Sequence, residues 1–331
     1  MLTKRQNMLE TIHGGSPDRF VNQFEALRMM RINPYTEVNP KVPKGGPATK
    51  DAWGVWKVWE DGQPGSFPLH DPEHLACGDI EHWERYIKAP SLDFPAEAWE
   101  KGIADMETVD RNEQFACVSV SPGLFEQLHY LQGMENAMIN FLEEPEKTHE
   151  LVDYLTEWEV EYASLLCKYL HPDAVFHHDD WGTQKSTFLS VEVFDEFIAP
   201  AYKKIYGYYK EHGVEVVVHH SDSFAATLVP SMIDIGIDVW QGCMSTNDIP
   251  NVIEQYGGKI TVMGGIDSAW VDKPDWTPEE VESVVRRVLD ELGGSYFIPC
   301  ATMGTNRSSF PGVYEKISEV IDAVNRERFG A

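Results

Sequence analysis

From residue 115 onward, short apolar runs alternate with longer amphipathic segments. The runs are rich in β-branched and aromatic residues, as buried strands are, and the segments between them have helical periodicity. The predicted strands are 115–120, 174–176, 214–218, 239–240, 260–263 and 296–298, and the predicted helices are 145–170, 191–212, 224–235, 250–256, 278–292 and 313–328. Strands and helices that alternate in this way predict βαβ units in a parallel α/β sheet.

The first third of the chain has a different pattern. Residues 2–13 are predicted as a short helix that ends at Gly14, and Phe20–Phe24 as a first strand. Residues 34–72 are rich in Pro, Gly and Trp and lack helical periodicity, which predicts an irregular segment with hairpin character. Six strand–helix units and one earlier strand favour a single (β/α)8 TIM-type barrel with an irregular N-terminal insertion, in one domain of residues 1–331. No GxGxxG motif follows a predicted strand, which argues against a doubly wound sheet.

Composition narrows the classes of partner. The 331 residues include 54 Asp and Glu against 27 Lys and Arg, a formal net charge of −27 at pH 7. This charge argues against nucleic acid and anionic membranes as partners, and it disfavours a polyanionic substrate unless local arginines override it. The five cysteines are dispersed, and neither a signal peptide nor a run of about 18 apolar residues is present. We therefore expect a cytoplasmic protein with reduced thiols.

Polar residues follow most of the predicted strands. In a barrel of this kind, catalytic residues lie at the C-terminal ends of the strands. The strands are followed by Ser121-Pro122-Gly123, by residues 177–182 (HHDDWG), by residues 219–222 (HHSD), by Gln241-Gly242-Cys243, by residues 264–267 (GGID) and by Pro299-Cys300. The recurrence of His, Asp and Cys is typical of a metal centre or an acid–base site, although any single one of them could instead cap the next helix.

Two strand ends carry doublets whose members face opposite sides of the sheet. Only one of Asp179 and Asp180, and one of His219 and His220, can therefore enter the barrel mouth. The interpretation that we favour places Asp180 and His220 there.

Three residues from two strands are candidate metal ligands. His220, Asp222 and Cys300 would supply nitrogen, oxygen and sulfur, and would leave a fourth position open, as in catalytic zinc sites. Cys300 could equally be a small buried apolar side chain. Aromatic residues could line a pocket for a flat ligand or simply pack the N-terminal segment onto the barrel; they are Phe20, Phe24, Trp53, Trp56, Trp59 and Trp181.

Five stretches resemble the uroporphyrinogen decarboxylase superfamily in order and spacing. They are DRFVNQFEALRMM (18–30), SPGLFEQLHYLQGMENAMINFLEEPE (121–146), HHDDWGTQKSTFLSVEVFDEFIAPAYKKI (177–205), VVVHHSDSFAATLVPSMIDIGIDVWQ (216–241) and VMGGID (262–267). The resemblance covers most of the chain and implies a (β/α)8 barrel with its site in the mouth.

Two activities divide that superfamily. The decarboxylases hold an octacarboxylate porphyrinogen with an arginine-rich N-terminal motif and an Asp in the cleft. In this chain Glu25 stands among the expected basic positions, although Arg28 and Arg31 remain. The other branch comprises zinc-dependent, corrinoid-linked methyltransferases whose ligands look like H-x-C and a later Cys. Here Asp222 replaces the first Cys, which makes the implied site harder and better suited to polarising an ether or alcohol oxygen.

The sequence therefore predicts an enzyme that moves a methyl group from a small methoxylated or methylated donor to the corrinoid (cobalamin) of a partner protein. This O-demethylation would use Zn²⁺ as a Lewis acid. The net charge favours a neutral or cationic donor. The predicted catalytic residues are Asp180 and His220, the substrate-binding residues are Phe24, Glu25, Asp179, Trp181 and Gln241, and the metal ligands are His220, Asp222 and Cys300.

Three alternatives remain open at this point. They are metal-free uroporphyrinogen decarboxylation, methyl transfer from a methylcorrinoid to a thiol or folate, and a barrel that binds a corrinoid or another ligand without turning it over.

Overall fold

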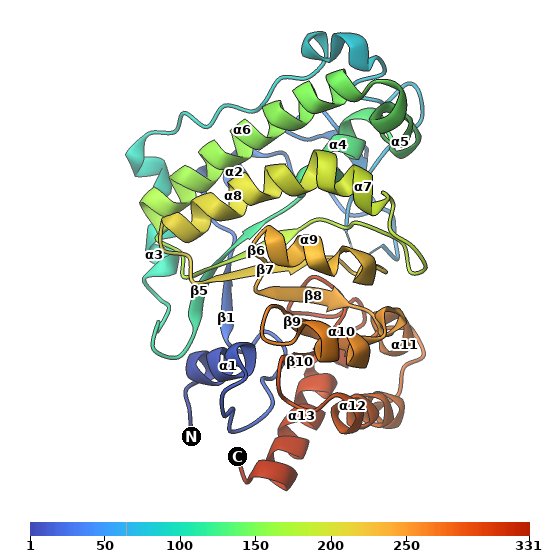
Figure 1. Cartoon of the computed structure of the whole chain (residues 1–331). Helices are drawn as coiled ribbons and strands as arrows, with labels where there is room; N and C mark the ends of the chain where they lie inside the picture. Colours follow the sequence, from blue (N-terminus) through green and yellow to red (C-terminus); the bar gives the residue numbers. More distant parts are fainter. Residues whose placement is uncertain (64) are drawn as a thin grey trace.

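Seven parallel strands form a curled sheet at the centre of the computed structural model, which describes residues 1–63 and 65–331 (Figure 1). Their order is that of the sequence: β1 (Leu27–Met30), β5 (Phe115–Val120), β6 (Ala174–His178), β7 (Val216–His220), β8 (Val239–Cys243), β9 (Thr261–Ile266) and β10 (Phe297–Ala301). The predicted TIM-type α/β barrel is confirmed, with seven paired strands in place of eight.

The segment before β1 occupies the gap between β10 and β1. The backbone N–H of Gln23 donates to the Pro299 carbonyl at 3.2 Å, and the Gln23 side-chain oxygen accepts from the Ala301 N–H at 3.3 Å. Gln23 has a φ of 50°, which an extended strand does not allow. The predicted strand at Phe20–Phe24 is therefore wrong: residues 20–22 are irregular, residues 23–26 form a turn, and the first strand begins at Leu27.

Helices cover the outer face of the sheet (Figure 1). They are α1 (Lys4–His13), α3 (Glu100–Met106), α4 (Leu124–Gln132), α5 (Met134–Glu143), α6 (Pro145–Leu170), α7 (Val191–Val193), α8 (Ala199–Glu211), α9 (Val229–Asp234), α10 (Ile249–Tyr256), α11 (Ser268–Val271), α12 (Pro278–Leu292) and α13 (Val313–Phe329). A π-helical turn, Phe194–Ile198, joins α7 to α8, so the predicted helix at 191–212 is one run of three pieces. Short 3₁₀ turns lie at Ile80–Arg85, Ala96–Trp99, Ala226–Leu228 and Ser245–Asn247.

The N-terminal insertion has the predicted hairpin character. It contains α2 (Pro34–Val38) and a small antiparallel sheet of β2 (Thr49–Lys50), β3 (Trp56–Val58) and β4 (Phe67–Pro68). Among the described residues, no helix combines the length and apolar character needed to cross a membrane.

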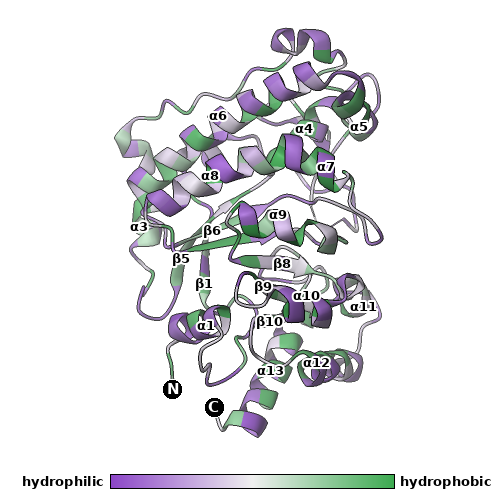
Figure 2. Ribbon diagram, in the orientation of Figure 1, coloured by the Kyte–Doolittle hydropathy of each residue, from purple (hydrophilic) through white to green (hydrophobic). Residues whose placement is uncertain are grey.

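Strand residues alternate between two separate cores. One set fills the barrel interior, together with Phe24 from the turn before β1, and includes Phe176, Val218, Met263 and Cys300. The other set packs against the surrounding helices, whose surfaces in Figure 2 alternate between hydrophilic and hydrophobic colours, most clearly along α6 and α8. This alternation decides which polar residue at each strand end faces the barrel mouth.

Candidate active site

Three side chains converge at the C-terminal ends of β6 and β7. Ligand atoms of His178, Asp180 and His220 all lie within 4.8 Å of one another. His178 and His220 stand opposite each other in the strand register, with their ring centroids 4.3 Å apart. Asp180 Oδ1 lies 3.6 Å from His220 Nε2. The arrangement gathers two imidazoles and one carboxylate, which is a donor set that suits zinc.

Gln241 on β8 fixes the orientation of His220. The Gln241 amide nitrogen donates to the Ala301 carbonyl at 3.1 Å, so its oxygen faces His220 Nδ1, which is the protonated ring nitrogen. Burial and the neighbouring charge of His178 lower the His220 pKa to about 4. His220 is therefore neutral near pH 7, and the lone pair of its Nε2 is directed toward Asp180. A metal ligand or a general base needs this form of histidine.

Glu126, in the first turn of α4, holds His178. Its Oε2 atom lies 3.0 Å from His178 Nδ1. Burial opposes protonation of His178, but Glu126, Asp180 and Asp222 outweigh it and raise the His178 pKa to about 10. Sequence reasoning missed Glu126 because it follows β5 on a helix, three residues after Gly123, and not at a strand end.

Asp180 and Asp222 stand side by side in the mouth. The Asp222 backbone N–H donates to Asp180 Oδ1 at 3.0 Å. Asp222 retains contact with solvent, but partial burial of its carboxyl group and the charge of Asp180 raise the pKa of this group well above the usual value. Two neighbouring carboxylates of this kind favour a shared proton or a bound cation. Asp222 is not one of the three residues within 4.8 Å, and its predicted role as a ligand stays a prediction.

Asp179 faces away from the mouth and ties β6 to α4. Its carboxylate accepts from the backbone N–H groups of Phe125 and Glu126 at 3.0 and 2.7 Å. It also accepts from Trp181 Nε1 at 2.9 Å and from the Tyr202 hydroxyl at 2.5 Å. Gly123 precedes α4 and has no side chain that could cap the helix. Asp179, at the end of β6, caps it instead. Burial and Glu126 raise the Asp179 pKa to about 7, although these donors oppose the rise.

The remaining predicted residues are spread around this centre. Trp181 is buried and stacks on His219 in the outer layer, with ring centroids 3.8 Å apart. Phe24 packs against Phe176 inside the barrel, and Glu25 accepts from the Asn22 backbone, with its pKa raised by burial. Their predicted roles in substrate binding stay predictions.

Cys300 is buried in the barrel interior and is separated from His220 by Gln241. Its sulfur accepts from the Gln241 amide at 3.8 Å, and burial raises the pKa of the thiol above its usual value. Cys300 is not part of the 4.8 Å group. Its role as a metal ligand is therefore still a prediction.

A cavity of about 380 Å³ opens beside His178. Its lining comprises Arg31, Ile32, Thr36, Glu37, Lys41, Ser119, Ser121, Phe176, His178 and Gly304. A Cβ atom on Gly304 would lie 2.9 Å from His220 Nε2 and 3.0 Å from His178 Cδ2, so the loop after β10 runs directly over both imidazoles. Only glycine allows this approach without displacing the loop.

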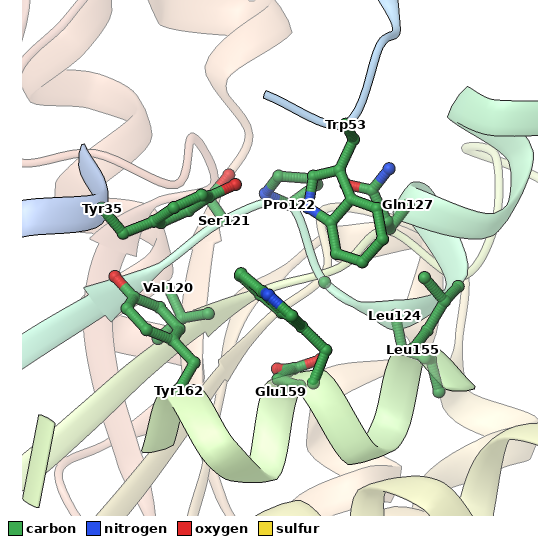
Figure 3. Close-up of a pocket in the computed structure, with 12 residues that line it drawn as sticks. Tyr35, Trp53, Val120, Ser121, Pro122, Leu124, Gln127, Leu155, Glu159 and Tyr162 are labelled. Atoms are coloured by element: carbon green, nitrogen blue, oxygen red, sulfur yellow. The ribbon is translucent and has the colours of Figure 1, made fainter. Parts of the chain in front are cut away.

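A second, much smaller cavity lies outside the barrel (Figure 3). Figure 3 shows the rings of Tyr35, Trp53 and Tyr162 gathered above Glu159 on α6. Glu159 pairs with His177, which faces outward. At about 30 Å³ the cavity can hold water molecules but not a flat ligand. For Trp53 this favours packing of the N-terminal insertion over a role in a ligand pocket.

Comparisons with known proteins agree with this fold. Over 162 residues, 48% of the chain, the sequence is 26% identical to a methylated-thiol–coenzyme M methyltransferase of Methanosarcina mazei. The matched segment spans 41% of that relative's length. The solved structure of a methyltransferase from Methanosarcina mazei matches 100% of both chains with a TM-score of 0.65 at 14% identity, which shows a shared fold.

Residues 107–302, more than half of the chain, match the model of the uroporphyrinogen decarboxylase (URO-D) family. That segment runs from just before β5 to the residue after β10, and it includes His178, Asp180 and His220. The chain belongs to the uroporphyrinogen decarboxylase family.

Proposed function

We propose that this protein is a methyltransferase that moves a methyl group from a small methoxylated or methylated donor to a corrinoid carried by a partner protein. The convergence of His178, Asp180 and His220 within 4.8 Å at the barrel mouth is the observation that carries the proposal. Similarity to the methyltransferase of Methanosarcina mazei supports the same class of reaction.

The three residues fit a zinc ion by the chemistry of their neighbours. Metal-bound imidazoles almost always donate their second ring nitrogen to a carboxylate or carbonyl. Glu126 stands in that position on His178, and Gln241 on His220. Nε2 of neutral His220 is free to bind the ion, whereas His178, whose pKa is raised to about 10, would release its Nε2 proton as the ion binds. His178, Asp180 and His220 would hold Zn²⁺, which when bound supplies a Lewis acid for the oxygen of the donor.

The protein's own groups would orient the donor. A cavity of about 380 Å³ is at the small end of ligand pockets, so it suits a donor of a few ring or chain atoms. Phe176 lines its apolar side, and Ser119 and Ser121 offer hydroxyl groups. Asp222, beside Asp180, is placed to accept or return a proton as the donor oxygen changes charge.

Metal analysis of the purified protein tests the proposal. We expect close to one zinc ion per chain, loss of zinc and of methyl transfer to cob(I)alamin in His220→Ala, and retention of zinc in Cys300→Ala. If Cys300→Ala loses zinc and His178→Ala retains it, the ligands are instead those predicted from the sequence, His220, Asp222 and Cys300. Wild-type protein that binds no zinc would overturn the proposal.

Uroporphyrinogen decarboxylation is the second candidate. It is favoured by Asp180 in the mouth and by Arg31 on the cavity wall. The cavity is small for a tetrapyrrole with eight carboxylates, and so we rank this activity second. Formation of coproporphyrinogen from uroporphyrinogen by metal-free protein would decide in its favour.

A further inference from the structure

A buried carboxylate outside the barrel has few hydrogen-bond partners. Among the described residues no Lys or Arg is buried, whereas four acidic side chains are: Glu126, Glu159, Asp179 and Asp267. In the other three, hydrogen bonds reach both carboxylate oxygens. Glu159 bonds only to His177, through Oε1, and no described group donates to its Oε2. Because a buried carboxylate without compensating partners is costly, Glu159 needs a further donor or a cation.

His177 is not placed to supply that positive charge. Its Nε2 atom bonds to Glu159, and its Nδ1 atom is buried without a hydrogen-bond partner. A protonated imidazole would therefore leave an N–H donor unsatisfied at Nδ1, which is costly and rare in folded proteins. This geometry favours a neutral His177 that donates to Glu159. In the part of the chain that the structure describes, the carboxylate thus has no positive partner.

Glu159 lines the small cavity of about 30 Å³ outside the barrel (Figure 3). Gln127 on α4 lines the same cavity, and its amide nitrogen is buried without a hydrogen-bond partner. The cavity therefore has a carboxylate with an unused oxygen on its wall and a donor that lacks an acceptor. One water-sized particle needs at least ~10–15 Å³, so the cavity has room for about two.

Aromatic rings form much of the remaining wall. Tyr35, Trp158 and Tyr162 line the cavity, and their ring centroids lie 5.1 to 5.3 Å apart. The faces of aromatic rings attract cations, most strongly where water is excluded. Mg²⁺ and Ca²⁺ take about six or more oxygen ligands, which a largely aromatic and apolar lining does not offer. The carboxylate and the rings together favour a monovalent cation.

We propose that this cavity binds one monovalent cation of the size of ammonium or K⁺ against Glu159, together with one water molecule that accepts a hydrogen bond from Gln127. Of the two ions, ammonium suits the cavity better, because its N–H groups can donate to the carboxylate, to the water and to aromatic ring faces. The inference is independent of the proposed function, since Glu159 and His177 lie outside the barrel, away from the three residues of the candidate metal centre.

Thallium(I) tests the position of the ion, because it resembles ammonium and K⁺ in charge and size and scatters X-rays anomalously. Crystals of the full chain soaked in thallium(I) nitrate should show an anomalous peak beside the Glu159 carboxylate in the wild type and none there in Glu159→Gln. Glu157→Gln is the matched control and should keep the peak, since Glu157 lies two residues earlier on α6 and is exposed. A wild-type cavity that holds only water, or an equal peak in Glu159→Gln, would overturn the inference.

Thermal unfolding tests the same site in solution. Ammonium chloride at ten times its dissociation constant should raise the wild-type Tm by about 2 °C over tetramethylammonium chloride of equal ionic strength, since the larger ion does not fit the cavity. Glu159→Gln should abolish this rise, Gln127→Leu should reduce it, and Glu157→Gln should keep it. A larger rise with K⁺ would keep the cation site but overturn the preference for ammonium. An equal ammonium effect in Glu159→Gln, or none in the wild type, would overturn the site itself.

Discussion

Asp179 and Asp180 are adjacent carboxylates with different tasks, and conversion of each to Asn should separate them. Asp179 is fully buried and caps α4, whereas Asp180 is partly exposed in the barrel mouth. We expect Asp179→Asn to destabilise the fold, and Asp180→Asn to leave stability almost unchanged while it reduces zinc binding and methyl transfer.

The magnitude follows from the donors around Asp179. Its Oδ1 accepts only from the Glu126 N–H, so the new amide group would turn toward that donor, leave it without a partner and cost about 1–3 kcal/mol. Its Oδ2 accepts from Phe125, Trp181 and Tyr202, and these three bonds would lose their charge assistance, at a total cost of about 2 kcal/mol. These losses total about 4 kcal/mol, which is an upper bound on the net effect, because the neutral Asn also relieves the burial and Glu126 repulsion that raise the Asp179 pKa.

Urea unfolding followed by circular dichroism measures this difference. The experiment is best done at pH 8, because the Asp179 pKa is raised to about 7 and the wild-type side chain is then ionised. Asp180→Asn serves as the control, since it removes the same charge one residue along. An Asp179→Asn protein within about 0.5 kcal/mol of wild type, beyond the usual effect of a surface substitution, would refute this account of the α4 cap.

Three further predictions concern the surroundings of the site. Gln241→Leu should weaken zinc binding about 10- to 100-fold in a chelator competition assay, because His220 loses the group that holds its Nδ1 proton; unchanged affinity would contradict this role. Gly304→Ala should weaken zinc binding at least ~10-fold, because the new Cβ lies 2.9 Å from His220 Nε2; in a crystal structure, an unshifted loop with zinc bound would disprove it. His129 is buried on α4, and burial and His70 lower its pKa to about 3, so the folded state resists its protonation. The free energy of unfolding is therefore at its full value above pH 6.5, and protonation of the unfolded His129 lowers it by about 2 kcal/mol between pH 7 and pH 5. Urea unfolding of His129→Phe at both pH values should show a correspondingly smaller loss than the wild type.

The sequence predicts the fold well because the signals for strands and helices are local. Strand 115–120 and helices 145–170 and 278–292 have the predicted bounds, since apolar runs and helix caps mark them clearly. The first strand was misplaced because the left-handed conformation of Gln23 depends on its contact with Pro299 and not on its own residue type.

The site is less predictable because strand ends indicate where polar residues lie but not which way they face. The HHDD and HHSD motifs each place alternate residues inside and outside the barrel, and only the cores on the two sides fix the choice: His219 bonds to Tyr206 outside, while His220 faces the mouth. Gln241 was expected to bind substrate, which stays a prediction; the contact that the sequence did not predict is its hydrogen bond with His220. Glu126 lies on a helix that follows its strand at a longer distance.

The outward-facing residues of these motifs explain why the doublets suit a metal centre. A strand end that carries only an inward ligand is free to move with its loop, and a shift of about 1 Å is enough to spoil catalytic geometry. In this protein Asp179 ties the end of β6 to the N-terminus of α4, and the same helix turn presents Glu126 to His178. One buried carboxylate thus fixes both a proposed metal ligand, His178, and the group that orients it. Loss of the Asp179 contacts should therefore weaken zinc binding as well as the fold, whereas loss of Asp180 should affect zinc binding alone.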